Sequence, residues 1–106
     1  MKKIISLLLV CVMALCLFTA CGEKTEKLTM ATNAEFPPFE YLENGEIVGA
    51  DVEIAQAIAA KMGRELEITN IDFDAALTGA ATGKYDMAVA GITANDDRKK
   101  NMNFSV

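Results

Sequence analysis

The chain has 106 residues, which leaves room for one small domain at most. Its 15 Asp and Glu outnumber its 10 Lys and Arg, and this acidic balance argues against a nucleic-acid partner, because phosphate binding needs clustered positive charge. The sequence contains no histidine, which excludes the usual catalytic triads and most zinc sites.

The first twenty residues have the pattern of a secretory leader. Lys2 and Lys3 precede an apolar core that runs from Ile4 to Phe18. A transmembrane anchor and a first helix of the fold are the alternatives. The core is shorter than the roughly 20 residues that span a bilayer, and it has no polar face to turn toward water. We therefore predict a signal peptide at residues 1–20.

The end of this leader indicates lipid attachment. Cleavage before Cys21 would place the bulky Phe18 where a soluble secreted protein has a small residue. "FTAC" (residues 18–21) resembles instead the lipobox of bacterial lipoproteins, in which the cysteine is lipidated. The other cysteines, Cys11 and Cys16, lie within the leader, so Cys21 has no disulfide partner after export. We predict lipidation at Cys21 and a short tether at residues 21–26.

The next part of the chain predicts a strand, a hairpin and a helix. "KLTMAT" (residues 27–32) alternates as a strand does. Asn44-Gly45 supplies two residues that tolerate positive φ, so we expect a hairpin turn there. Residues 51–62 predict a helix that ends at Gly63. The apolar stripe expected to be buried on this helix comprises Ile54, Ala55, Ile58, Ala59 and Met62.

The remaining segments predict a strand, a helix, a strand buried on both faces, a short helix and the start of another strand, at residues 65–71, 74–82, 85–91, 95–101 and 102–106. Asp74 and Asn95 are the expected N-caps of the two helices. Gly79 interrupts the first of these helices, which is tolerable if another segment packs closely there. The order of elements predicts an α/β unit with a mostly parallel sheet flanked by helices.

Three loops are expected to meet at the carboxyl-terminal edge of this sheet, where open α/β sheets bind ligands. The first offers Phe36, the second offers Phe73, and the third offers Thr93, free amides and Arg98. Gly91 would let a ligand approach the backbone closely. Arg98 could then grip a carboxylate with two parallel hydrogen bonds. The loops predict a pocket for a small anion with an apolar or polar tail.

These residues also have simpler interpretations. Arg98 could pair with Asp97 or Glu35 at the surface, and the aromatic rings could be ordinary packing. Asp72 and Asp74 have the spacing of a catalytic carboxylate pair, but Asp74 serves better as a helix cap.

Three motifs, F-x-P-F-E, A-G-I-T-x-x-x-x-R and N-x-x-F-S, follow one another in residues 36–40, 90–98 and 101–105. With them, the chain from about Lys27 to its end resembles solute-binding protein family 3, the polar amino-acid-binding proteins of bacterial ABC importers. The resemblance implies a type II periplasmic-binding-protein-like fold. Residues 27–106 would form most of one lobe with the second lobe absent, because family members are much longer.

The resemblance also implies roles for individual residues. The arginine that matches Arg98 grips the α-carboxylate of the ligand, and the residues that match Gly91 and Thr93 bind its α-carboxylate or α-amino group. The remaining matches surround the side chain of the ligand or help to select it: Phe36, Phe73 and Asn33.

The implied function is the substrate-binding component of an ABC transporter, which captures a free polar amino acid outside the cytoplasmic membrane and delivers it to a permease. No enzyme activity, cofactor or metal is implied, and lipidated Cys21 would hold the protein at the cell membrane. The alternative is an extracytoplasmic enzyme or sensor of the same fold: an amino-acid-like dehydratase, a wall-lyase module, or the ligand-binding domain of a kinase or channel. The lipobox argues against both classes. Residues 21–106 alone are expected to bind amino acids no better than about millimolar, because a single lobe leaves the ion pair open to water.

Overall fold

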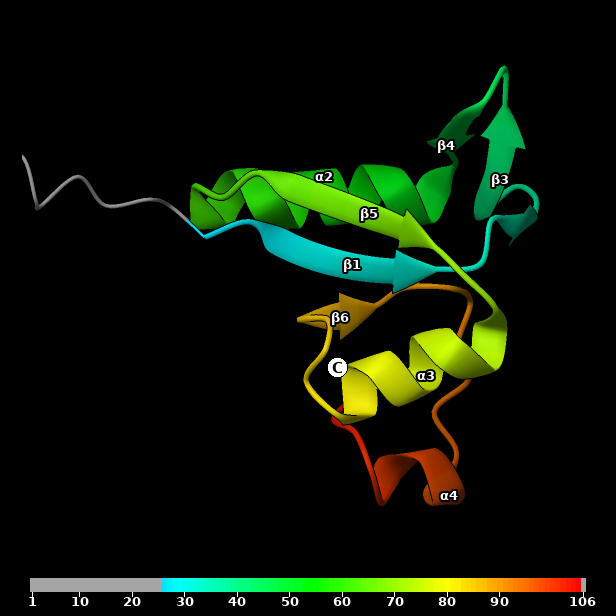
Figure 1. The fold of residues 1–106 in the computed structure, drawn as a ribbon, viewed down its shortest axis with the longest axis vertical. Coiled ribbons are helices and arrows are strands. Elements are labelled where there is room, and N and C mark those ends of the chain that lie inside the picture. Colours follow the sequence, from blue (N-terminus) through cyan, green and yellow to red (C-terminus); the bar gives the residue numbers. More distant parts are fainter. Residues whose placement is uncertain (1–25, 106) are drawn as a thin grey trace, which may run out of the picture.

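The computed structural model describes residues 26–105, so the predicted leader and Cys21 lie outside the described residues. The centre of the fold is a parallel sheet in the order β5–β1–β6 (Figure 1), formed by β1 (Leu28–Thr32), β5 (Leu66–Asn70) and β6 (Met87–Ala88). Met30 of β1 lies opposite Ile68 on one side and Met87 on the other. The predicted parallel sheet is confirmed, and the carboxyl ends of its strands share one edge.

A small antiparallel sheet follows β1 and stands beyond that edge (Figure 1). It consists of β2 (Glu35–Phe36), β3 (Glu40–Glu43) and β4 (Glu46–Val48). Asn44 and Gly45 connect β3 to β4 with φ angles of 51° and 81°. Both turn residues therefore adopt positive φ, as a tight hairpin requires, and the predicted hairpin is confirmed.

The helices are α2 (Ala50–Met62), α3 (Phe73–Ala81) and the single turn α4 (Asp96–Lys99). α2 packs against β5 and the hairpin strands, whereas α3 packs against β1 and β6. α2 ends at Gly63, whose φ of 65° places it in the left-handed conformation that was predicted for this cap. Among residues 26–105, no helix combines the length and the apolar character needed to cross a bilayer.

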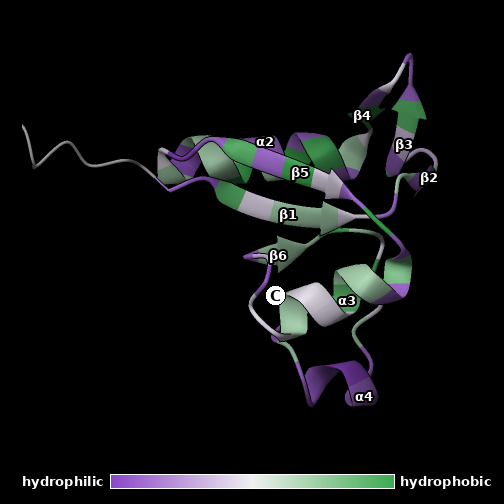
Figure 2. Cartoon of the chain, viewed as in Figure 1, coloured by the Kyte–Doolittle hydropathy of each residue, from purple (hydrophilic) through white to green (hydrophobic). Residues whose placement is uncertain are grey.

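The core is built around the central strand β1. Met30, Ala31 and Thr32 are 0 % exposed, and the hydroxyl of Thr32 donates a 2.7 Å hydrogen bond to the carbonyl oxygen of Val89. This bond satisfies a polar group that burial would otherwise penalise. The helices contribute mainly small buried side chains, which allow a close approach to the sheet: Val52, Ala55, Ala59 and Ala76. In contrast, α4 is hydrophilic along its whole length (Figure 2).

The predicted stripe on α2 is only partly correct. Ala55 and Ala59 are buried, but Ile54, Ile58 and Met62 are 56 %, 40 % and 51 % exposed. The buried face of α2 also includes Val52, which the prediction omitted. The helix is rotated so that its small residues meet the sheet, and the larger apolar side chains point away from it.

Three further predictions are wrong in detail. The second long helix begins at Phe73, so Asp72 occupies the N-cap position and Asp74 lies in the first turn. The strand predicted at residues 85–91 pairs only through Met87 and Ala88, and both are half-buried rather than buried on two faces. Residues 102–105 form no strand. Within the described residues, 102–105 pair with no strand, and the outer edge of β6 stays unpaired.

Candidate functional site

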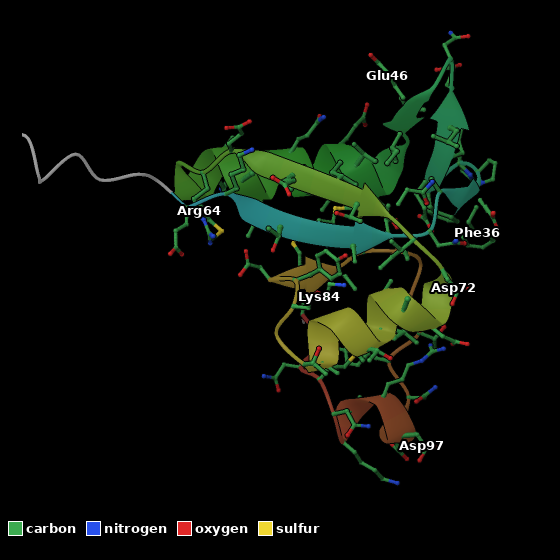
Figure 3. All side chains as sticks on the ribbon, viewed as in Figure 1. Phe36, Glu46, Arg64, Asp72, Lys84 and Asp97 are labelled. Atoms are coloured by element: carbon green, nitrogen blue, oxygen red, sulfur yellow. The ribbon has the colours of Figure 1, made fainter. Side chains whose placement is uncertain are left out.

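A hollow of about 320 Å³ lies at the carboxyl-terminal edge of the sheet, where the segments after β1, β5 and β6 meet the hairpin. Figure 3 shows Phe36 and Asp72 beyond the arrowheads of β1 and β5, at the side of the molecule that carries this hollow. The residues that line it are Asn33, Glu35, Phe36, Glu40, Phe73, Ala90 and Gly91. The structure therefore gathers four of the predicted site residues, Asn33, Phe36, Phe73 and Gly91, around one space.

Asn33 joins the first two of these segments. Its side-chain amide donates a 3.0 Å hydrogen bond to the carbonyl oxygen of Ile71, in the loop after β5. In return, Asn70 Oδ1 accepts a 2.9 Å hydrogen bond from the amide of Ala34. The amide of Ile71 also donates to the carbonyl oxygen of Thr32 over 2.9 Å. These reciprocal bonds hold the two loops at a fixed distance, which positions Asn33 at the hollow.

Phe36 and Gly91 meet across the hollow. The Phe36 side chain is 53 % exposed, and its ring centroid lies 5.3 Å from that of Phe39. Gly91 has a φ of 58°, and a Cβ at this position would lie 3.2 Å from two carbon atoms of the Phe36 ring. A side chain would therefore be strained in its backbone conformation and would also press on the ring. Glycine at position 91 therefore leaves room for the Phe36 ring beside this turn of the backbone.

Arg98 lies beside the hollow, next to one of its walls. Asn95 caps α4 as predicted, because its Oδ1 accepts a 2.9 Å hydrogen bond from the amide of Arg98. The guanidinium donates a 2.9 Å hydrogen bond to the carbonyl oxygen of Thr93. Its Cζ atom stands 5.4 Å from the centroid of the Phe73 ring, within the range of a cation–π contact. The positive charge is thus held against Phe73, which lines the hollow.

The alternative pairings of Arg98 do not occur. Asp97 forms its ion pair with Lys100, with 2.9 Å between Asp97 Oδ1 and Lys100 Nζ. In the part of the chain that the structure describes, no carboxylate lies within ion-pair distance of the Arg98 guanidinium. Neither Arg98 nor Thr93 lines this hollow. Arg98 lines instead a second hollow of about 430 Å³ between α3 and α4. Thr93 meets Arg98 through its carbonyl group.

The sequence reasoning missed Glu40, which is the most unusual residue of the site. Glu40 is 1 % exposed, and its Oε2 atom has no hydrogen-bond partner among the described residues. Burial, then a hydrogen bond with Asp51 and the negative charge of Asp51, raise the pKa of Glu40 to about 8. No local signal pointed to it, because β2, whose pairing with β3 places Glu40 opposite Phe36, was not among the predicted elements.

Glu35 was considered only as a partner for Arg98, but it too lines the hollow. The lining therefore contains two carboxyl groups, Glu35 and Glu40, and no basic side chain. By contrast, Asp72 and Asp74, which were weighed as a catalytic pair, are absent from the lining. The chemistry available in the hollow is that of two aromatic faces, carboxyl oxygens and an Asn amide, with one guanidinium beside it.

The sequence and the fold both match known proteins. The family model of the bacterial extracellular solute-binding proteins, family 3, matches residues 28–106. The arginine-binding extracellular protein ArtP of Bacillus subtilis is 39 % identical over 112 aligned residues, which cover 99 % of this chain and 44 % of ArtP. ABC transporter arginine-binding protein 1 of Escherichia coli is 34 % identical over 89 residues, covering 83 % of this chain and 37 % of that protein. This chain therefore spans less than half of the length of either relative.

A solved structure agrees with these relatives. The arginine-bound form of domain 1 from TmArgBP, the arginine-binding protein of T. maritima, superimposes with a TM-score of 0.67 at 43 % sequence identity. The match covers 70 % of this chain and 60 % of that chain. The expected fold of one partial lobe of a periplasmic amino-acid-binding protein is thereby confirmed. On the family match and the identities together, the chain belongs to the bacterial extracellular solute-binding proteins, family 3.

Proposed function

We propose that this chain is the substrate-binding component of an ABC importer, and that its ligand is a free amino acid with a cationic side chain, arginine in the first instance. The named relatives are binding proteins rather than enzymes, and those cited above are named for arginine. The acidic pair weighed for catalysis, Asp72 and Asp74, does not line the hollow.

The observation that carries this proposal is the convergence of Phe36, Phe73 and Gly91 on one hollow with the Arg98 guanidinium fixed beside it. The carboxylate of an amino acid would accept hydrogen bonds from the Gly91 segment and from Arg98, which donates to the Thr93 carbonyl oxygen but has no acidic partner among the described residues. The side chain of the ligand would then lie between the faces of Phe36 and Phe73.

The charge of the lining supports a cationic side chain. Glu35 brings a carboxylate to the lining, whereas the raised pKa of Glu40 keeps its carboxyl group protonated near neutral pH, and no Lys or Arg lines the hollow. A guanidinium group is planar, donates several hydrogen bonds and stacks on aromatic faces, so it suits two phenylalanines flanked by acidic acceptors. Asn33, which is fixed by its bond to Ile71, can contribute a further polar contact to the end of the ligand.

A relative supports ligand binding by one lobe. Domain 1 from TmArgBP is a single domain in an arginine-bound form, and this chain covers 60 % of it. We expect this chain to retain the same capacity at low affinity, about millimolar, because the ligand stays open to water on one side. Weak binding of this kind is best measured by a method that reports on individual residues.

The test is a titration of the ¹⁵N-labelled chain without its leader and without Cys21, residues 22–106, followed by amide NMR shifts. L-Arginine is expected to shift the Gly91 and Thr93 amides in a saturable way. Agmatine lacks the carboxylate, so it should leave these two amides unchanged while still shifting residues near Phe73. L-Citrulline replaces the guanidinium by a neutral group and should bind at least about fivefold more weakly than arginine. Equal binding of arginine and citrulline would overturn the assignment of a cationic side chain, and equal shifts with agmatine would overturn the carboxylate site.

We further propose that the protein acts outside the cytoplasmic membrane, held there by a lipid on Cys21, and hands its ligand to a permease. The extracellular family supports the location, and the "FTAC" sequence supports the anchor. Cys21→Ser is expected to release the protein from membranes or to leave the leader uncleaved. Cys16→Ser, within the leader, is the matched control and should be processed and retained normally. Normal processing and membrane retention of Cys21→Ser would show that the lipid anchor is absent.

A further inference from the structure

The surroundings of the Glu40 carboxyl group do not suit its ionised form. Glu40 is 1 % exposed, and Oε2 has no hydrogen-bond partner among the described residues. A buried carboxylate without a donor is strongly penalised, whereas a protonated carboxyl group can itself donate. Asp51 is brought next to this part of β3 by the 2.9 Å hydrogen bond from its amide to the carbonyl oxygen of Phe39, and it helps to raise the pKa of Glu40. Two ionised carboxylates can only accept hydrogen bonds. A proton on Glu40 would therefore let its carboxyl group donate a hydrogen bond to the carboxylate of Asp51.

Asp51 connects this pair to the site. Its Oδ2 atom accepts a 3.2 Å hydrogen bond from the amide of Gly91, which lines the hollow. Asp51 also lies at the start of α2, and its own amide donates a 2.9 Å hydrogen bond to the carbonyl oxygen of Phe39, the residue before Glu40. The Glu40 carboxyl, the first turn of α2 and the segment after β6 are thus joined through one aspartate.

We propose that Glu40 and Asp51 hold one proton between them and act as positioning residues for the Gly91 amide, so that loss of this proton weakens ligand binding. The inference rests on the proposed function for its effect on the ligand, but the proton-sharing pair itself requires no ligand. Without the proton, two negative charges would lie side by side in a buried place and repel each other. Asp51 can relieve this repulsion only by moving, and the Gly91 amide that it holds would move with it.

Few other charges surround the pair. On α2, the acidic neighbour of Asp51 in the sequence is Glu53, which is exposed. On β2, Glu35 lines the same hollow. Residues 89–95, which bring Gly91 to the hollow, contain no titratable side chain, and neither does the segment 33–34. The charged groups around Phe73 are its exposed neighbours Asp72 and Asp74, together with the guanidinium of Arg98. Asp51 is therefore the charge that acts most strongly on Glu40.

The test follows the side-chain carboxyl ¹³C shifts of Glu40 and Asp51 and the backbone ¹⁵N shift of Gly91 in the ligand-free chain, from pH 4 to pH 10. Carbon detection avoids the loss of exchanging amide protons at high pH. The Glu40 carboxyl is expected to titrate with a midpoint near pH 8, and Gly91 should follow the same curve. Glu40→Gln, which is neutral at all pH values and can still donate to Asp51, should abolish this transition at Gly91. A Glu40 carboxyl that titrates near pH 4, or a Gly91 curve that is unchanged in Glu40→Gln, would overturn the pair.

Two further variants separate the effect of this pair from that of the other carboxyl group in the hollow. Glu35→Gln removes the other carboxyl group of the hollow and should leave the Gly91 transition in place. Asp51→Asn removes the neighbouring charge and should move the Glu40 transition to lower pH. This second variant keeps the proposal testable if Glu40→Gln fails to fold. Loss of the Gly91 transition in Glu35→Gln, or an unmoved Glu40 transition in Asp51→Asn, would contradict the proposal.

The ligand effect is measured separately with L-arginine at pH 7 and pH 9. The dissociation constant is expected to rise at least about threefold between these pH values in the parent chain, beyond the change in Glu40→Gln. Because arginine titrates equally in both experiments, the difference reports on the protein. If arginine fails to bind at either pH while Gly91 still titrates, the proposed ligand is wrong and the proton-sharing pair stands. A parallel pH dependence in the two proteins would show that the pair does not control binding.

Discussion

The two edges of the parallel sheet handle their charged groups in opposite ways. At the amino-terminal edge, Asp86 Oδ2 accepts hydrogen bonds from the amide and the hydroxyl of Thr29, at 2.9 and 3.1 Å, and from Arg64 Nη2 at 3.3 Å. Arg64 donates in addition to the carbonyl oxygens of Glu26 and Lys27. Each charged group at this edge therefore has partners of the right kind within the chain.

At the carboxyl-terminal edge the partners are missing or mismatched. Glu40 faces another carboxyl group, Asp51, and the Arg98 guanidinium has a carbonyl oxygen but no acidic partner in the described part of the chain. The pKa values record the contrast. The backbone amide of Thr29, followed by its hydroxyl and the Arg64 guanidinium, lowers the pKa of Asp86 despite some burial, whereas burial and Asp51 raise that of Glu40. The polar groups at the amino-terminal edge are paired and contribute to stability. Those at the carboxyl-terminal edge lack matched partners, which is typical of groups that bind a ligand or a proton.

Removal of Arg98 should affect only the carboxyl-terminal edge, where the ligand is proposed to bind. Arg98→Ala is expected to weaken arginine binding by up to about 1 kcal/mol, the value of an ion pair that stays open to water, because Arg98 is only half-buried and a single lobe leaves the ligand exposed. Lys99→Ala on the same helical turn is the matched control and should bind arginine normally. The amide-shift titration with arginine measures both. Unaltered binding by Arg98→Ala would return this residue to a purely structural role on the Phe73 ring.

Removal of Asp86 should affect only the amino-terminal edge, and therefore the stability of the fold. Asp86→Ala leaves two donors of Thr29 and one of Arg64 without their acceptor, and we expect a loss of about 1–2 kcal/mol in the free energy of unfolding, moderated by solvent access. Asp86→Asn keeps one oxygen for Thr29 and should lose less. Urea unfolding measures the loss, and arginine binding should be unchanged because Asp86 lies at the far edge. A binding defect in a folded Asp86→Ala protein would show that the two edges are not independent.

Phe36 tests whether the aromatic wall serves binding rather than packing. Phe36→Ala is expected to weaken arginine binding by about 1 kcal/mol and to change the stability little, because the ring is 53 % exposed. The preference for arginine over citrulline should also fall. Phe39→Ala removes the neighbouring ring, which does not line the hollow, and is expected to leave the preference intact. A loss of stability without a change in ligand preference would support the packing interpretation.

The smallest expected effect concerns the pH dependence of stability at the two edges. The raised pKa of Glu40 means that the folded chain binds its proton more tightly than the unfolded chain, so stability should fall as the pH rises from about 4.5 toward 8. Asp86 has a lowered pKa, so its contribution is present above about pH 4 and is lost as the pH falls further. Glu40→Gln should therefore gain up to about 1 kcal/mol at pH 8 and nothing at pH 4. Urea unfolding at both pH values measures this, and an equal effect at the two pH values would contradict the assignment.

Local signals were enough to predict most of the elements. The alternation of residues 28–32, the Asn44-Gly45 turn, the stop at Gly63 and the Asn95 cap each depend on neighbours within a few positions. A sequence can therefore specify them without knowledge of the fold. The convergence of Phe36, Phe73 and Gly91 was also predictable, because the carboxyl ends of parallel strands must share an edge.

Tertiary structure decided the features that depend on a distant partner. Residues 102–105 have the composition of a strand, but a strand forms only where it pairs with another, and this segment joins neither outer edge of the described β5–β1–β6 sheet. Gly79 became necessary only because Tyr85 packs against it, where a Cβ would come within 2.5 Å of the ring. Glu40 reads in the sequence as an ordinary polar residue of a hairpin. Its burial beside Asp51 arises when the start of α2 is bonded to Phe39, and only that arrangement raises its pKa and makes it the proton-holding group proposed for the hollow.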